Sequence, residues 1–280
     1  RMADFKTPPA DLLAGLIEQC RKAGADAADA RIGETDGVGV AVRDGKLESI
    51  EREESVSVAL RCFYGKRQAH VSSADLSPDG LRLLAERCVA MAKAVPEDKY
   101  CGLPEASMLA KGDLDMDLSG EPEMPAEALE ERALAAEAAA LGTQGIKTVA
   151  GCGASWNRSK RWVAASNGFA AFKTGSSTSL GLSAVAEKDG KMERDYDSWS
   201  VRFLNKMPSP EEVGKTAGDR TIARLGARKL GTQKAAVIYD RRVSASLIGA
   251  LLGAISGPSI ARGVSYLKER MGEQVFAKGV

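Results

Sequence analysis

Between Gly37 and Lys93, apolar residues occupy every second position of two consecutive runs, and this pattern constrains the fold most strongly. Such alternation is typical of strands with one buried face. The alternating residues are Val38, Val40 and Val42 in the first run and Val56, Val58, Leu60 and Cys62 in the second. Asp44-Gly45 between the runs favours a type I′ turn, and Gly65 permits a second reversal. The pattern predicts three strands joined by tight turns.

An amphipathic helix is predicted directly after these strands. Ser77 can cap its first turn, and Pro78 fits a position where no amide hydrogen is needed. Apolar residues then return with helical spacing, and Pro96 predicts the end of the helix. The residues with this spacing are Leu81, Leu84, Ala85, Cys88 and Ala92. Strands and helix together indicate an α+β fold, with several small domains and mostly antiparallel sheets flanked by helices.

Changes in composition and periodicity predict four parts along the chain. They are an N-terminal α+β domain at 1–95, a connector rich in Pro, Gly and Asp at 96–125, a middle domain with an antiparallel meander at 126–230, and the start of an incomplete C-terminal domain at 231–280. The N-terminal domain begins with a predicted helix from Pro8 to about Ala23, capped by Thr7.

The middle domain is predicted to combine helices with repeated hairpins. An alanine-rich helix at 126–141 precedes four or five expected strands between Ile146 and Leu204. Two turn sequences separate these strands, Asn167-Gly168 and Lys188-Asp189-Gly190. Ser209 and Glu212 form a capping box that predicts a further helix ending near Leu225.

In the last part, the sequence predicts a strand at Ala235–Tyr239 and helices at 243–255 and 259–271. The first of these helices is apolar nearly all round, so we expect it to be buried from several sides. Too little sequence follows it to provide that cover. The pattern therefore indicates a chain cut short within its third domain.

Charge and cysteine usage exclude several classes of function. The chain has 39 basic and 38 acidic residues, a net charge of +1, so we expect neither nucleic acid nor a membrane as direct partner. No signal peptide and no apolar run of about 20 residues is present, which favours a cytoplasmic protein. The five cysteines are widely spaced and form no CxxC pair, as expected for buried free thiols.

Candidate chemistry in the sequence is sparse. His70 is the only histidine, so a metal site would lack the usual partners, and a surface or edge histidine is the better interpretation. Cys152, between two glycines, is a possible nucleophile, but a buried strand cysteine is favoured because only His70 could serve as its base. The acidic stretch from Glu48 to Glu54 is interpreted as a solvated, edge-protecting strand. We therefore predict no catalytic and no metal-binding residue in this chain.

Two blocks of the sequence resemble the TldD/PmbA family, often labelled modulators of DNA gyrase, and specifically its PmbA (TldE) branch. The first block runs from Val38 to Lys93 and includes Gly65, the Ser72-Ser73 pair and Asp75-Leu76-Ser77. The second, Ser244 to Gly272, contains LLGAISGPSIARGVSYLKERMG and is the more specific. The resemblance covers essentially the whole chain, although family members are considerably longer.

The resemblance implies metal-dependent proteolysis of peptide or unfolded protein substrates by a TldD–TldE heterodimer. In this family the TldD-type subunit holds the metal through an HExxxH helix and a later cysteine, and this chain has no such motif. The resemblance therefore implies the non-metal subunit, with no cofactor in this chain and the metal in its partner. The alternative is a regulatory binding protein that modulates DNA gyrase or its inhibitors without catalysis.

Ser256, Ser259 and Arg262 are the residues predicted to line a cleft or an interface. They lie on a glycine-loosened segment between the two helices expected in the last part of the chain.

Overall fold

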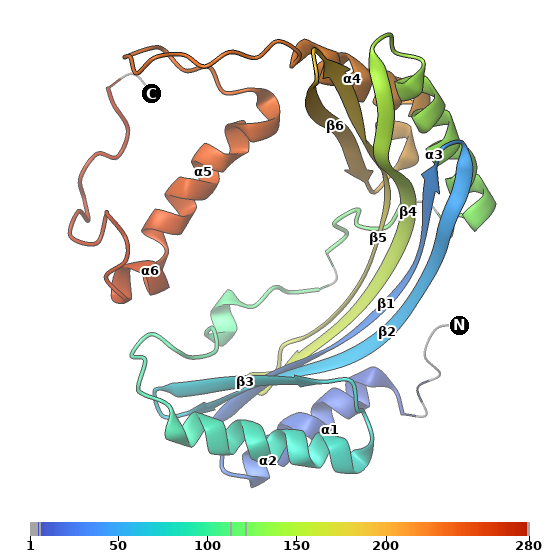
Figure 1. Cartoon of the computed structure of the whole chain (residues 1–280). Helices are drawn as coiled ribbons and strands as arrows, with labels where there is room; N and C mark the ends of the chain where they lie inside the picture. Colours follow the sequence, from blue (N-terminus) through green and yellow to red (C-terminus); the bar gives the residue numbers. More distant parts are fainter. Residues whose placement is uncertain (1–4, 6, 113, 121, 279–280) are drawn as a thin grey trace. The chain divides into compact units, whose positions relative to one another are not determined.

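The computed structural model describes residues 5, 7–112, 114–120 and 122–278 (Figure 1). It divides the chain into two compact units, residues 1–227 and 228–280. Each unit is described below by itself.

The first unit is built on one six-stranded antiparallel sheet with the strand order β3-β2-β1-β4-β5-β6. Its strands are β1 (Ala27–Arg43), β2 (Lys46–Tyr64), β3 (Arg67–Ser73), β4 (Ile146–Ala165), β5 (Ala170–Lys188) and β6 (Lys191–Val201). Strands from the ranges predicted as N-terminal and middle domains share this sheet, because β1 pairs with β4 from Asp29↔Ala165 to Val42↔Cys152. Sheet and helices together confirm the predicted α+β class.

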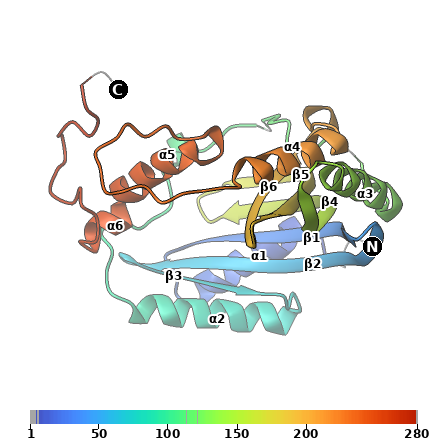
Figure 2. The ribbon, with the colours of Figure 1, turned by 45° about the horizontal axis from the view of Figure 1, so that its top comes forward.

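Four helices pack on one face of this curved sheet, its convex side (Figures 1 and 2). They are α1 (Pro9–Lys22), α2 (Pro78–Ala94), α3 (Ala126–Leu141) and α4 (Pro210–Ala223). Every second residue of β1 faces them, with Ile32 in the core under α1 and α2 and Val38 in the core under α3 and α4. The opposite face of the sheet carries no α-helix of this unit in the described residues.

Local signals in the sequence are mostly confirmed. Asp44 and Gly45 have φ angles of 52° and 71°, which makes the predicted type I′ turn. Ser77 accepts a hydrogen bond from the Gly80 amide, and Ser209 caps α4 in a full capping box. The predicted Thr7 cap is wrong, because Pro8 occupies the N-cap of α1 and no side chain caps this helix.

The prediction of four or five strands between Ile146 and Leu204 is also wrong. The structure has three there, since β4 and β5 extend without interruption for 20 and 19 residues. Glycines such as Gly175 and Gly181 lie within β5 without reversing it. The segment 96–125 is called the connector below, and its described residues contain one short 3-10 helix, Ala106–Met108. A second 3-10 helix, Leu204–Lys206, follows β6.

The second unit contains α5 (Arg241–Ile255) and the short α6 (Gly257–Ala261). The helix predicted at 259–271 is wrong, since α6 ends at Ala261 and Gly263 has a φ of 69°. The strand predicted at Ala235–Tyr239 is absent, and no strand in the described part of this unit could pair with it. Among the residues of α5, Ala254 alone is buried, so the expected cover on several sides is not present within this unit. No helix in the described residues is long and apolar enough to cross a membrane.

Candidate functional site

His70 lies exposed on β3, opposite Arg61 of β2, on the face of the sheet that carries no α-helix. The described residues contain no group of three His, Cys, Asp or Glu side chains that could hold a metal ion. A catalytic zinc typically needs three protein ligands and one open position. The donor groups in the described part of the chain therefore do not fit a catalytic metal.

All five cysteines are free and buried, as the sequence predicts. The Sγ of Cys152 lies in the core under α3 and donates to the Ala133 carbonyl oxygen at 3.2 Å. Burial raises the pKa of Cys152 to about 12. A nucleophilic cysteine needs an accessible thiolate at neutral pH, so this geometry supports the structural interpretation.

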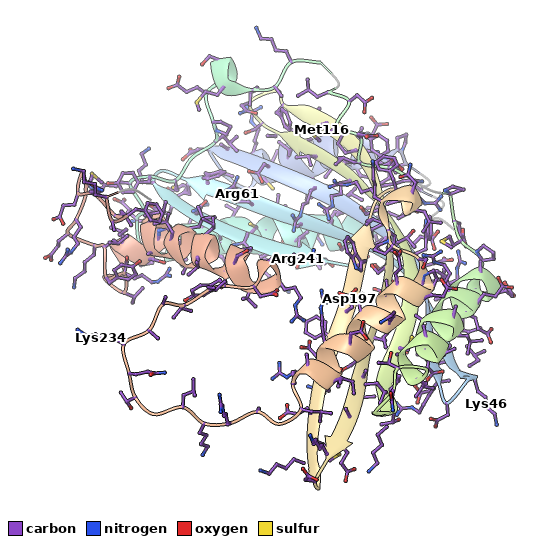
Figure 3. The ribbon with its side chains drawn as sticks, turned by 90° about the horizontal axis from the view of Figure 1, so that it is seen from above. Lys46, Arg61, Met116, Asp197, Lys234 and Arg241 are labelled. Carbon is purple, nitrogen blue, oxygen red and sulfur yellow. The ribbon has the colours of Figure 1, made fainter. Side chains whose placement is uncertain are left out.

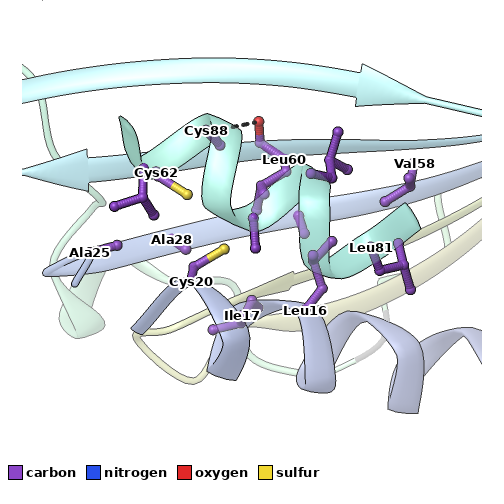
Figure 4. Packing of buried hydrophobic residues seen from close by; sticks show 14 of the residues in the cluster. Leu16, Ile17, Cys20, Ala25, Ala28, Val58, Leu60, Cys62, Leu81 and Cys88 are labelled. Carbon is purple, nitrogen blue, oxygen red and sulfur yellow. Dashed lines mark hydrogen bonds between the residues drawn. The ribbon is translucent and has the colours of Figure 1, made fainter. Parts of the chain in front are cut away.

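Three further thiols meet in the core under α1 and α2 (Figure 4). Cys88 donates to the carbonyl oxygens of Ala69 and Leu60, at 3.3 and 3.8 Å. A hydrogen bond with Cys20 and burial raise the pKa of Cys62 to about 12. These thiols belong to the packing of the core.

A row of buried charges separates the two cores on the helix-covered face. Glu34 and Asp36 lie between Ile32 and Val38 along β1, and both are about 5 % exposed. Arg158 of β4 binds Asp36 at 2.8 Å. Two further cations complete the row: Arg52 lies 3.1 Å from Asp36 and Lys160 lies 3.8 Å from Glu34. Because each buried carboxylate has a cation beside it, the row is electrostatically balanced.

The connector passes the edge of β5 at the point where β6 ends. β6 pairs with β5 only from Thr178 onward, so the preceding part of β5 has a free edge. The connector occupies it, because the Ser176 amide donates to the Leu118 carbonyl at 3.0 Å and the Gly120 amide donates to Ser176 Oγ at 2.8 Å. A Cβ at Gly120 would lie 1.7 Å from the Arg202 carbonyl oxygen, so only glycine fits this crossing.

An open groove of about 860 Å³ lies beside this crossing, on the face that carries no α-helix. Met116 of the connector lies over the neighbouring strands (Figure 3). The lining comes from β1, β4, β5, the connector, and the end of β6 with the segment after it. It includes Thr35, Asn157, Ser159, Arg161, Lys173, Gly175, Ser177, Met116, Asp117, Leu118, Ser200, Arg202, Phe203 and Lys206. Its volume is within the range of ligand-binding clefts. We take this groove as the candidate functional site of the first unit.

Positive charge predominates in the groove. Arg161, Arg202 and Lys206 are exposed, and none of them has a carboxylate partner within salt-bridge distance in the described residues. Lys173 donates to the carbonyl oxygen of Leu114. Asp117 is the one carboxylate among the described lining residues. The groove therefore offers cations and hydroxyl groups to an anionic or strongly polar ligand.

The sequence did not predict this groove, and the three residues predicted to line a cleft belong to the second unit. Ser256 lies between α5 and α6, and its carbonyl accepts from the Ile260 amide at 3.0 Å. Ser259 lies within α6, and the exposed Arg262 follows it. A smaller cavity of this second unit is lined by other residues, between Tyr266 and Val275. A role of the three residues in a cleft or interface stays a prediction.

Comparison with known proteins places the chain in a family of metallopeptidases. Three models of this family match the chain in order: PmbA/TldA metallopeptidase domain 1 at residues 28–92, the central domain at 120–225 and the C-terminal domain at 232–280. Together they account for most of the chain. The chain belongs to the PmbA/TldD family.

Curated relatives agree with this membership. The chain is 31 % identical over 252 residues to the metalloprotease PmbA of Escherichia coli O157:H7, which covers 90 % of this chain and 56 % of the relative. It is 28 % identical to the metalloprotease PmbA homolog of Haemophilus influenzae, covering 93 % and 58 %. The chain thus spans little more than half the length of these relatives.

Solved structures show the same fold. A protein of Bacteroides thetaiotaomicron described as a candidate modulator of DNA gyrase aligns with a TM-score of 0.82 at 19 % identity, covering 95 % of this chain and 61 % of that one. TldE from Thermococcus kodakarensis aligns with a TM-score of 0.69 at 18 % identity, covering 94 % and 59 %. At these identities the likeness concerns the fold alone.

Proposed function

We propose that the chain is the non-metal subunit of a TldD/TldE-type heteromeric metallopeptidase that acts on peptide or unfolded protein substrates. Membership of a metallopeptidase family supports the reaction class. The structural likeness to a protein named TldE agrees with this role. In this proposal the metal belongs to a TldD-like partner, and the complex works in the cytoplasm, where five free thiols stay reduced.

The observation that carries this proposal is the distribution of metal-donor groups. The single imidazole, His70, is exposed on β3, whereas four of the five thiols lie in the two cores under the helices and the fifth, Cys101, is buried in the connector. The buried carboxylates of β1, Glu34 and Asp36, are paired with cations, and the more deeply buried Glu137 accepts from two turn amides. In the described residues, no three of these donor groups come together to hold a metal ion. A subunit with this arrangement needs a partner to supply the metal.

Co-purification with a TldD-type protein, followed by cleavage of a denatured protein substrate, tests the proposal. We expect the two chains to elute together and to cleave the substrate, and we expect a metal chelator to abolish cleavage. His70→Ala should leave both association and cleavage unchanged, because this side chain holds no metal here. Failure to associate would refute the proposal, as would chelator-insensitive cleavage by this chain alone.

A regulatory role at DNA gyrase is the second candidate function. It is favoured by two structural neighbours, from Bacteroides thetaiotaomicron and Thermotoga maritima, that are described as candidate modulators of DNA gyrase. This hypothesis predicts direct binding to purified gyrase that persists at high salt. The balanced charge of the chain argues against a contact mediated by DNA.

A further inference from the structure

We propose that the groove between the connector and strands β4 and β5 binds an acidic polypeptide segment in extended conformation. The groove is the 860 Å³ space described above. The bound segment would be part of a peptidase substrate, so this inference rests on the proposed function. It adds the charge and the shape of the segment that the chain recognises.

The charge of the groove supports an acidic ligand. Arg161 on β4 and Arg202 and Lys206 after β6 surround the space, with Asp117 as the opposing carboxylate in the described lining. The nearest buried carboxylates, Glu34 and Asp36, face the helix-covered side of the sheet and are paired there with cations. They therefore do not cancel the positive charge of the groove. A carboxylate entering it gains favourable electrostatic interactions with several cations.

The floor of the groove supports an extended ligand. Opposite positions on paired strands share a face, which places Thr35, Ser159 and Gly175 in one row and Asn157 and Ser177 in the next. These side chains are short, so another polypeptide can lie close to the sheet. Their hydroxyl and amide groups can exchange hydrogen bonds with a peptide backbone. Met116, Leu118 and Phe203 add apolar surface at the margins.

A nucleic acid is the less favourable ligand, because Phe203, at the margin, is the one aromatic residue in the described lining of the groove. Trp156 is 1 % exposed and lies in the core under α3. Trp162 packs against Phe5 and Phe172, with ring centroids 5.8 and 4.9 Å away, on the helix-covered side. Single-stranded nucleic acids are usually held by accessible aromatic rings in addition to cations. Trp156 and Trp162, which flank Arg158, Lys160 and Arg161 in the sequence, are thus unavailable for stacking.

Fluorescence anisotropy with the isolated 280-residue chain tests this inference. The probes are a fluorescein-labelled octapeptide of alternating glutamate and serine, and the same peptide with lysine in place of glutamate. We expect the acidic peptide to bind at least tenfold more tightly than the basic one, and we expect added salt to weaken its binding. The double variant Arg161→Glu/Arg202→Glu should weaken acidic binding at least tenfold. Asp117→Asn should strengthen it, and asparagine tolerates the φ of 51° at this position.

Arg87→Glu is the matched control, because Arg87 is exposed on α2, which covers the other face of the sheet. This control should leave binding unchanged. Equal binding by wild type and the double variant, or an equal loss in Arg87→Glu, would overturn the inference. Displacement of the acidic peptide by an equimolar octathymidylate would also overturn it and favour a nucleic acid. The assay needs neither metal nor partner, so chelator-sensitive cleavage by the assembled pair would still stand if peptide binding failed.

Discussion

Glu137 of α3 holds the turn between β1 and β2, and its replacement measures how much one buried carboxylate contributes to this fold. The side chain is 1 % exposed. Its Oε1 accepts from the Asp44 amide at 2.9 Å, and its Oε2 accepts from the Gly45 amide at 2.8 Å. Both turn residues have positive φ, so these bonds fix a backbone conformation that is otherwise uncommon outside glycine.

The expected loss of stability follows from these two hydrogen bonds. A bond to a charged group contributes about 1.5–3 kcal/mol. Asp44 and Gly45 are exposed, so water can replace part of the lost bonding after truncation. We therefore expect Glu137→Ala to lower the free energy of unfolding of the first unit by about 3 kcal/mol. For a unit of this size, that corresponds to a fall in Tm of about 6–12 °C. Glu137→Gln keeps one acceptor oxygen and should lose about half as much.

Urea unfolding followed by tryptophan fluorescence is the assay, because Trp156 lies in the same core. Glu131→Ala is the matched control, since Glu131 is exposed on the same helix and the change in helix propensity is identical. Its effect should stay within about 0.5 kcal/mol. If Glu137→Ala unfolded at the same urea concentration as Glu131→Ala, the contribution assigned to the buried carboxylate would be refuted.

Three other substitutions and treatments have defined outcomes. Gly214→Ala places a Cβ 2.1 Å from a carbonyl oxygen of α3 and should lower the free energy of unfolding, measured in urea, by about 2 kcal/mol. The control is Gly15→Ala at an exposed position with no atom within 4 Å, which should raise it by up to about 1 kcal/mol. Cys152 should resist iodoacetamide at pH 8.5 in the native chain and react in urea, as measured by mass spectrometry. The reason is that its pKa is raised to about 12, so the native thiol is almost entirely protonated at pH 8.5. Asp36→Ala leaves the guanidinium of Arg158 without its carboxylate and should cost about 2–3 kcal/mol, whereas a cost near zero would show that solvent already screens this pair.

Local features of the fold could be predicted from the sequence, because each depends on residues that are close together in the chain. The turn at Asp44-Gly45 and the capping box at Ser209 are of this kind. The pairing of β1 with β4 joins residues more than 100 positions apart, and alternation alone does not specify which strands pair. The same limit explains the wrong strand at Ala235–Tyr239, where an apolar run has no partner strand in the described unit.

The buried charges of β1 show a second limit to predicting strands from the alternation of apolar residues. Glu34 and Asp36 occupy positions of β1 whose side chains face the buried side of the sheet. Apolar residues are expected there, so the sequence does not show the alternation of one continuous strand. The cations that compensate them, among them Arg158 and Lys160, come from a strand far along the chain. A charged residue at a buried strand position can be reconciled with the strand only when its oppositely charged partner is known. The structure supplies that partner, and β1 is then continuous over 17 residues.

The candidate groove draws on five separate segments of the chain, so no single motif could reveal it. One strand nevertheless carries part of its signal. Along β5, Leu180 and Leu182 face the helix-covered side of the sheet, whereas Gly175, Ser177 and Gly181 face the opposite side. Exposed strand positions commonly favour β-branched or aromatic residues, so glycine and serine there weaken the strand. Helix packing does not require them, because no α-helix of the described unit covers that face, although a Cβ at Gly181 would lie 2.9 Å from the Ser198 Cβ on β6. Close approach of another polypeptide does require short side chains, and the cations beside them select its charge.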